Sequence, residues 1–223
     1  RLDAMDNDTI MDLASNPLNG GFIGGESYII DKPQLPAPRL RSPRTGMITN
    51  NTTPTFWWTN VRGGETYEIE FSTDNTFVTI LGSQVVGGLS YTVVTPFGDG
   101  NYFWRVRALN AVSEPGVWSS PRTFTINTAG PIAPVLSFPA DNSSVHLTPT
   151  FKWGSSSTAV LYEFQYDNDP DFSSLIYTIS RRTTYSRPPA MAIGTYHWRV
   201  RAKDAIGNWG AWSAPFTINI TGP

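Results

Sequence analysis

The chain has 223 residues, a formal net charge of -2 and no cysteine. The charge argues against a nucleic-acid partner, the lack of an apolar run of about eighteen residues argues against a membrane span, and the lack of cysteine excludes disulfides and thiolate metal sites. Eight Trp, twelve Phe and nine Tyr supply core material, and the many Gly, Pro, Ser and Thr residues favour an all-β fold over helices.

Residues 1–35 form an acidic leader that resembles neither later part of the chain. Residues 1–31 carry one arginine against six carboxylates, a net charge of -5. Five side chains at its end have strand chemistry and are candidates for an intersubunit strand: Phe22, Ile23, Tyr28, Ile29 and Ile30. The alternatives are a disordered leader or the tail of a preceding domain. Because the chain opens with Arg1, we also expect an upstream segment such as a secretion signal.

Residues 36–131 show seven short segments with strand character, separated by turn residues. The segments lie near residues 38–40, 56–58, 67–71, 77–86, 90–94, 102–108 and 124–126. Alternation in the sixth places Tyr102, Trp104, Val106 and Ala108 on one face. This pattern predicts a sheet with one buried side.

The same series of strand segments returns in residues 132–223, so the chain contains an internal repeat. The segment 102–108 recurs almost unchanged as 196–202, and the matches continue at 53–58 with 148–153, 118–121 with 212–215, and 124–127 with 216–219. A period of roughly 95 residues suits whole domains rather than solenoid units. We therefore predict a first domain at 36–131 and a second at 132–223.

These motifs resemble the fibronectin type III domain. A Trp ends the second strand (Trp58, Trp153), a Tyr lies in the third (Tyr67, Tyr162), and a Tyr-x-Trp-Arg-Val-Arg-Ala strand follows. The resemblance implies two tandem seven-stranded immunoglobulin-like β-sandwiches. It also implies that Tyr102 and Tyr196 form the tyrosine corner of each domain. Without cysteine, a secreted or cell-surface protein of this kind is expected to be prokaryotic.

A Trp-rich segment of the second repeat, residues 209–213, is similar to the Trp-Ser-x-Trp-Ser box of cytokine-receptor modules. The similarity implies that outward arginines stack between tryptophans of the neighbouring strand. The expected members of both stacks are Arg105, Arg107 and Trp118, and Arg199, Arg201, Trp209 and Trp212.

We expect no catalysis and no cofactor. The only histidines are His146 and His197, and neither lies beside a nucleophile pattern. The alternating carboxylates Asp167, Asp169 and Asp171 resemble a calcium loop, although the usual glycine and distal glutamate are missing. A capped hairpin turn is the competing interpretation of that segment.

Five Asn-x-Ser/Thr triplets make the chain a candidate glycoprotein, provided that it reaches a compartment that glycosylates. They begin at Asn7, Asn50, Asn51, Asn142 and Asn219. Two aromatic residues, Trp57 and Phe103, are expected to face outward on different sheets, where each is a possible contact point or is covered by its neighbours.

Together these features predict a non-enzymatic extracellular structural or adhesive protein. The sharper hypothesis is a surface fibre in which residues 21–30 add as a strand to the next copy, head to tail. Partners are then copies of the chain itself, other surface proteins or glycans. The alternatives are a spacer module of a secreted carbohydrate-active enzyme and a receptor-type ligand-binding ectodomain whose site lies near residues 127–133.

Overall fold

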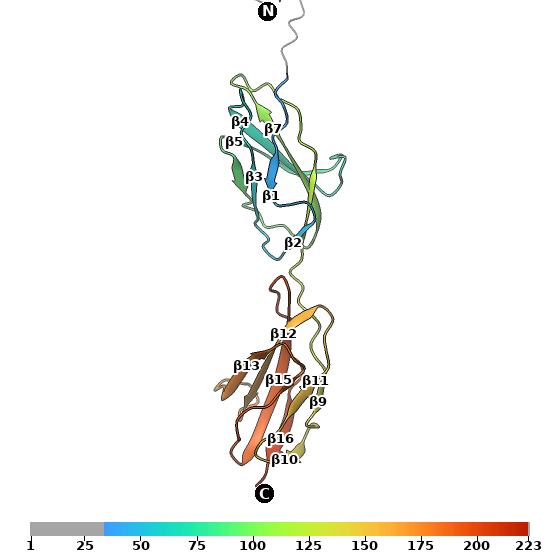
Figure 1. Cartoon of the computed structure of the whole chain (residues 1–223), viewed down its shortest axis with the longest axis vertical. Coiled ribbons are helices and arrows are strands. Elements are labelled where there is room, and N and C mark those ends of the chain that lie inside the picture. Colours follow the sequence, from blue (N-terminus) through green and yellow to red (C-terminus); the bar gives the residue numbers. More distant parts are fainter. Residues whose placement is uncertain (1–33, 223) are drawn as a thin grey trace, which may run out of the picture. The chain divides into compact units, whose positions relative to one another are not determined.

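The computed structural model describes residues 34–222. This part of the chain contains sixteen strands and no helix, which confirms the predicted all-β class, and none of it could therefore cross a membrane as an apolar helix. Strands β1 to β8 belong to the first repeat, and β9 to β16 belong to the second (Figure 1). The strand candidates in the leader lie outside the described residues.

The first repeat is a sandwich of a three-stranded and a five-stranded sheet. The smaller sheet has the order β1-β3-β6 and the larger has the order β2-β8-β7-β4-β5. The strands are β1 (Leu40–Ser42), β2 (Met47–Thr49), β3 (Thr55–Trp58), β4 (Thr66–Ser72), β5 (Ile80–Val86), β6 (Ser90–Thr92), β7 (Gly100–Leu109) and β8 (Arg122–Ile126). All neighbours pair antiparallel except β2 and β8, which are parallel.

The second repeat has the same arrangement. Its sheets have the orders β14-β11-β9 and β10-β16-β15-β12-β13. The strands are β9 (Leu136–Phe138), β10 (Ser143–Val145), β11 (Phe151–Trp153), β12 (Ala159–Asp167), β13 (Tyr177–Arg181), β14 (Tyr185–Ser186), β15 (Gly194–Asp204) and β16 (Phe216–Ile220). The fold therefore confirms two tandem sandwiches.

The expected first strand of each repeat is divided between the two sheets. In the first repeat β1 pairs with β3 in one sheet, and β2 pairs with β8 in the other. Pro43 lies between the two segments and cannot donate a backbone hydrogen bond to a ladder. Each sandwich consequently has eight strand segments in place of the seven predicted.

Alternation in β7 directs its side chains as predicted. Trp104, Val106 and Ala108 are fully buried, while the arginines between them lie on the other face and are partly exposed. In β15, Trp198 and Val200 are buried in the same way. Each repeat has its own core of thirteen buried residues, and the two cores share no residue.

The sequence match proposed for the last strand is wrong by two residues. Tyr102 pairs with Phe124, whereas its counterpart Tyr196 pairs with Ile218 rather than with Phe216. Phe216 therefore corresponds to Arg122. The two strands must be matched by their register, which cross-strand hydrogen bonds set. The match based on local sequence similarity was displaced by two residues.

The segment between the repeats is hydrogen-bonded to the second repeat. The Asn208 side-chain amide donates to the backbone oxygens of Asn127 (3.0 Å) and Ala129 (3.3 Å), and it also donates to Asp204 (3.0 Å). Asn208 is buried. These bonds satisfy linker carbonyls that would otherwise rely on solvent.

Candidate functional site

The β5 strand at the edge of the larger sheet is the candidate interface of the first repeat. It pairs with β4 on one side only, and its seven residues include neither a charge nor a proline, although the pairing has an irregularity at Leu81. Ile80, Leu81 and Val85 are 41%, 49% and 56% exposed. Proteins normally protect such an edge with charges, proline, short length or a bulge, and of these β5 has only the irregularity at Leu81, near its start. The β5 edge therefore has the properties of a strand acceptor.

The other sheet edges are shorter or carry protecting residues. Strands β1, β6, β9, β14, β2 and β10 have at most three residues each. The counterpart of β5 in the second repeat is β13, which has five residues and ends at Arg181, followed by Arg182. Within the described residues, β5 is the long uncharged edge.

A shallow groove lies beside β5, where the two sheets of the first sandwich separate. It is lined from one side by Leu81 to Gln84 and from the other by apolar side chains that include Tyr91, Val93 and Phe97. Recognition of an added strand uses main-chain hydrogen bonds for affinity and such recesses for alternate side chains. The side chains of an added strand would meet these lining residues.

Arginines of the central strands stack on aromatic rings in both repeats. The guanidinium carbon of Arg105 lies 4.3 Å from the Trp118 ring centre and that of Arg107 lies 4.4 Å from it. In the second repeat the stack is longer, because Arg199 lies over Trp212 (4.3 Å) and Arg201 lies over both Trp212 and Trp209 (4.5 Å each). Burial, followed by the nearby charge of Arg201, lowers the pKa of Arg199.

Two members of these stacks were not identified from sequence. Arg105 lies 4.1 Å from the Phe77 ring, and Arg199 lies 4.0 Å from the Phe172 ring. Both phenylalanines have positive φ (57° and 58°) and lie outside the strands. Phe77 therefore does not belong to the strand predicted for residues 77–86, which begins at Ile80. The sequence did contain a sign of their shared role, because the two phenylalanines occupy equivalent positions in the repeats. Phe77 follows Ser72 by five residues, and Phe172 follows Asp167 by five.

Carboxylates on the neighbouring strands, β4 in the first repeat and β12 in the second, form ion pairs with three of these arginines. Glu70 pairs with Arg105 and Glu68 with Arg107, each at 2.7 Å, and Glu163 pairs with Arg201 at 2.6 Å. These groups are partly exposed, so each pair contributes about 0.2–1 kcal/mol or less. The arginines and aromatic rings of each stack thus cover the outer face of the larger sheet, and the ion pairs help to hold the arginines in place.

The tyrosine-corner geometry is present in the first repeat. The Tyr102 hydroxyl donates to the backbone oxygen of Gly98 at 3.0 Å. Tyr196 is buried at the equivalent place, but residues 34–222 offer its hydroxyl no such bond. The two repeats therefore differ in how this corner is held.

The suggested calcium ligands do not form a metal site. In the described part of the chain, no three His, Cys, Asp or Glu side chains are arranged to hold an ion. Asp167 is buried. The side chain of Ser173, followed by the Ser173 amide, which donates to the Asp171 carboxylate (2.9 Å), lowers the pKa of Asp171. The capped turn describes this segment better.

The corresponding turn in the first repeat centres on Asp74. Its carboxylate accepts hydrogen bonds from Thr76, Val78, Thr79 and Ser72. The hydroxyl of Thr76, followed by the amide of Thr79, lowers the pKa of Asp74 far below its usual value. The ionised carboxylate therefore organises this turn.

Replacing Asp74 with asparagine is expected to lower the stability of the first repeat at neutral pH. A carboxyl group whose pKa is lower in the folded state stabilises the fold above its unfolded pKa of about 3.9. That contribution is lost as the pH falls below this value. The urea midpoints of the native chain and of Asp74→Asn should consequently converge between about pH 4 and pH 2, whereas the exposed-site control Glu65→Gln should match the native chain throughout. A gap that stays constant with pH contradicts this.

The described sequons differ in accessibility. Asn50, Asn51 and Asn142 are exposed, whereas Asn219 is partly buried and its side-chain oxygen accepts a hydrogen bond from Thr195 (2.8 Å). Asn7 lies outside the described residues. Glycosylation stays a prediction for all five sequons, and among the described ones the three exposed asparagines are the most accessible.

The two outward aromatic residues differ in the same respect. Trp57 on β3 is 50% exposed, and Phe103 on β7 is partly covered. They belong to different sheets, as expected, and so do not share a site.

Comparisons with known proteins match the fold and not the sequence. No family model matches the chain, and no curated protein sequence does. Solved structures with a similar backbone include the fibronectin(III)-like modules of Clostridium thermocellum CbhA, with 14% identity and a TM-score of 0.47, over 83% of this chain and 94% of that one. Another is the chicken CNTN1 FN1-FN3 structure, with 15% identity and a TM-score of 0.45, over 84% of this chain and 66% of that one.

Proposed function

We propose that these two fibronectin type III-like sandwiches form the subunit of a non-enzymatic extracellular fibre. The leader of one copy, residues 21–30, adds as a strand to the β5 edge of the next copy. The observation that supports this proposal is the long, uncharged and exposed β5 edge. A contact between the leader of one copy and the β5 edge of the next is heterologous, and it produces a filament when successive copies do not close into a ring.

The leader contains a segment with the strand propensity and the apolar side chains that pairing with the β5 edge requires. Residues 21–30 include Phe22, Ile23 and Tyr28 to Ile30, which have high strand propensity. Every second side chain of an added strand points to the same face of the sheet. On the face with the groove, these side chains would contact Tyr91, Val93 and Phe97. Because both sandwiches already have their full set of strands, the leader extends a complete sheet rather than replacing a missing strand.

The test is assembly of the full chain. We expect light scattering and negative-stain electron microscopy to show filaments for the native chain, and monomers for a chain without residues 1–31. Val85→Lys should also give monomers, because it places a charge at the edge that must be buried on pairing. Val112→Lys is the matched control, since it makes the same change at an exposed turn of the same repeat and should leave assembly intact.

Two results would contradict the proposal. If the full chain stays monomeric at high concentration, the leader is not a polymerising strand. If Val85→Lys assembles as well as Val112→Lys, β5 is not the acceptor.

A further inference from the structure

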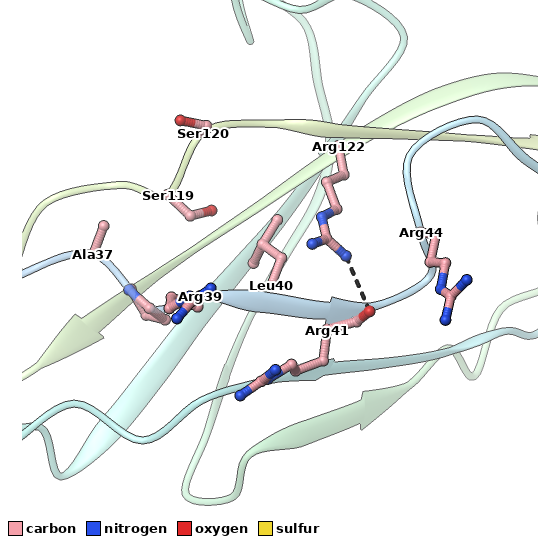
Figure 2. Close-up of a pocket in the computed structure, with 9 residues that line it drawn as sticks. Ala37, Arg39, Leu40, Arg41, Arg44, Ser119, Ser120 and Arg122 are labelled. Atoms are coloured by element: carbon pink, nitrogen blue, oxygen red, sulfur yellow. Dashed lines mark hydrogen bonds between the residues drawn. The ribbon is translucent and has the colours of Figure 1, made fainter.

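A second surface feature of the first repeat is a cleft between β1 and the start of β8, lined by four arginines. Arg39 and Arg41 flank the buried Leu40, Arg44 follows in the next turn, and Arg122 opens β8 (Figure 2). Ser119 and Ser120 complete the other wall. Residues some 80 positions apart in the chain thus form one basic surface, which we term the arginine cleft.

The charge of the arginine cleft is not neutralised by its surroundings. It contains four of the seven arginines in residues 34–131 and none of the six carboxylates in that range. Arg39, Arg41 and Arg44 are exposed and make no ion pair within residues 34–222. Guanidinium groups gathered in this way repel one another unless an anion lies between them.

Only Arg122 has a structural use for its side chain. Its Nη1 donates to the backbone oxygens of Arg41 (3.0 Å, dashed in Figure 2) and Pro43 (3.2 Å). These bonds tie β8 to the segment that crosses between the two sheets. The other three arginines make no side-chain hydrogen bond within the described residues, so the sandwich does not depend on them.

The second repeat supplies an internal control for this conclusion. Its cis Phe138-Pro139 corresponds to Ser42-Pro43, and the turn bond from Ser143 to Ala140 matches that from Met47 to Arg44. With this register the four arginines correspond to Val135, Ser137, Ala140 and Phe216. The same fold is built with no charge at any of the four positions. The fold therefore does not require the charges of Arg39, Arg41 and Arg44.

We propose that the arginine cleft binds a carboxylate-bearing chain, and that its occupant is the acidic segment Asp3 to Asp12 of this protein's leader. Guanidinium groups match carboxylates as paired donors better than any other side chain. The leader carries a net charge of -5 over residues 1–31, which makes it a source of suitable anions within the same protein. This proposal goes beyond the fibre and does not depend on it.

The acidic residues of the leader and the arginines of the cleft have the same spacing along the sequence. Asp6 and Asp8 are two residues apart, as are Arg39 and Arg41. In extended chains, residues two apart lie on one face at about 6.6–6.8 Å. A leader that binds in an extended conformation would present Asp6 and Asp8 on one face at this spacing, opposite the two exposed arginines that flank Leu40. Opposed pairs of this kind also fix the register of the contact.

A fluorescein-labelled peptide of residues 1–14 tests this inference. It is titrated into the full chain in which Asp3, Asp6, Asp8 and Asp12 are replaced by asparagine, so that the tethered leader does not compete. We expect saturable binding by fluorescence anisotropy at about 0.02 M salt that is strongly weakened at about 0.5 M. Replacing Arg39, Arg41 and Arg44 with glutamine should raise the Kd about tenfold, because exposed ion pairs are individually weak.

The matched control removes three exposed arginines elsewhere. Arg62→Gln, Arg181→Gln and Arg182→Gln together change the net charge equally and should leave the Kd within about twofold of the parent value. Circular dichroism confirms that each variant is folded, and Val85→Lys should bind the peptide normally, which separates this result from the fate of the fibre.

Three outcomes would overturn the inference. The first is no binding of the peptide at low salt. The second is an equal loss in both triple variants, which indicates only general charge attraction. The third is arginine-dependent binding of an acidic polysaccharide, polygalacturonate, with no binding of the peptide, which shows that the carboxylates come from a glycan and not from the leader.

Discussion

Replacing Trp104 with alanine is expected to unfold the first repeat at low urea concentration while the second repeat stays folded. Trp104 is fully buried at the centre of β7, and its ring meets Phe56 edge-on with centroids 4.8 Å apart. Truncating a buried Trp or Phe to alanine typically costs about 3–5 kcal/mol, a large share of the 5–15 kcal/mol that stabilises a domain. Because the two cores share no residue, the loss should be confined to one sandwich.

Urea unfolding followed by the NMR signals of the tryptophan indoles of each repeat measures this effect. The control is Trp57→Ala, which removes the same kind of side chain from a half-exposed position in the other sheet of the same sandwich and should change the midpoint little. Unfolding of both repeats in one transition would show that they are coupled. An equal effect of the two variants would show that Trp104 is not central to the core.

Ser119→Ala is expected to destabilise the first repeat by about 1–3 kcal/mol, although it removes a single oxygen. The Ser119 hydroxyl accepts a hydrogen bond from the Val106 amide (3.1 Å), and the Ser119 amide donates to the Val106 oxygen (2.9 Å). Ser119 is buried, so alanine leaves the Val106 amide without an acceptor and away from water. The second repeat has the same arrangement between Ser213 and Val200.

Hydrogen exchange at the Val106 amide, together with the urea midpoint, measures the effect of this change. The amide should exchange faster in Ser119→Ala than in the native chain. Ser120→Ala is the matched control, because Ser120 is the exposed neighbour and should alter neither quantity. Equal midpoints for the two variants would mean that the buried amide has found another acceptor.

The stacks of arginine on tryptophan show how far the sequence predicts local geometry. Arg105 and Arg107 alternate with buried Trp104 and Val106, so a period of two places them on the outer face without knowledge of the fold. The added phenylalanines needed the structure. Phe77 reaches Arg105 from a turn with positive φ, a conformation that strand propensity does not indicate.

The sequence by itself determined the all-β class, the two repeats and the faces of the central strands. These properties follow from side-chain alternation and from self-similarity, which are local or additive along the chain. The tertiary structure alone decided the division of the first strand, the two-residue shift in the last strand, the exposed uncharged edge at β5 and the arginine cleft. Each of these depends on which strands pair and in what register, and pairing joins residues such as Arg41 and Arg122 that no local pattern connects.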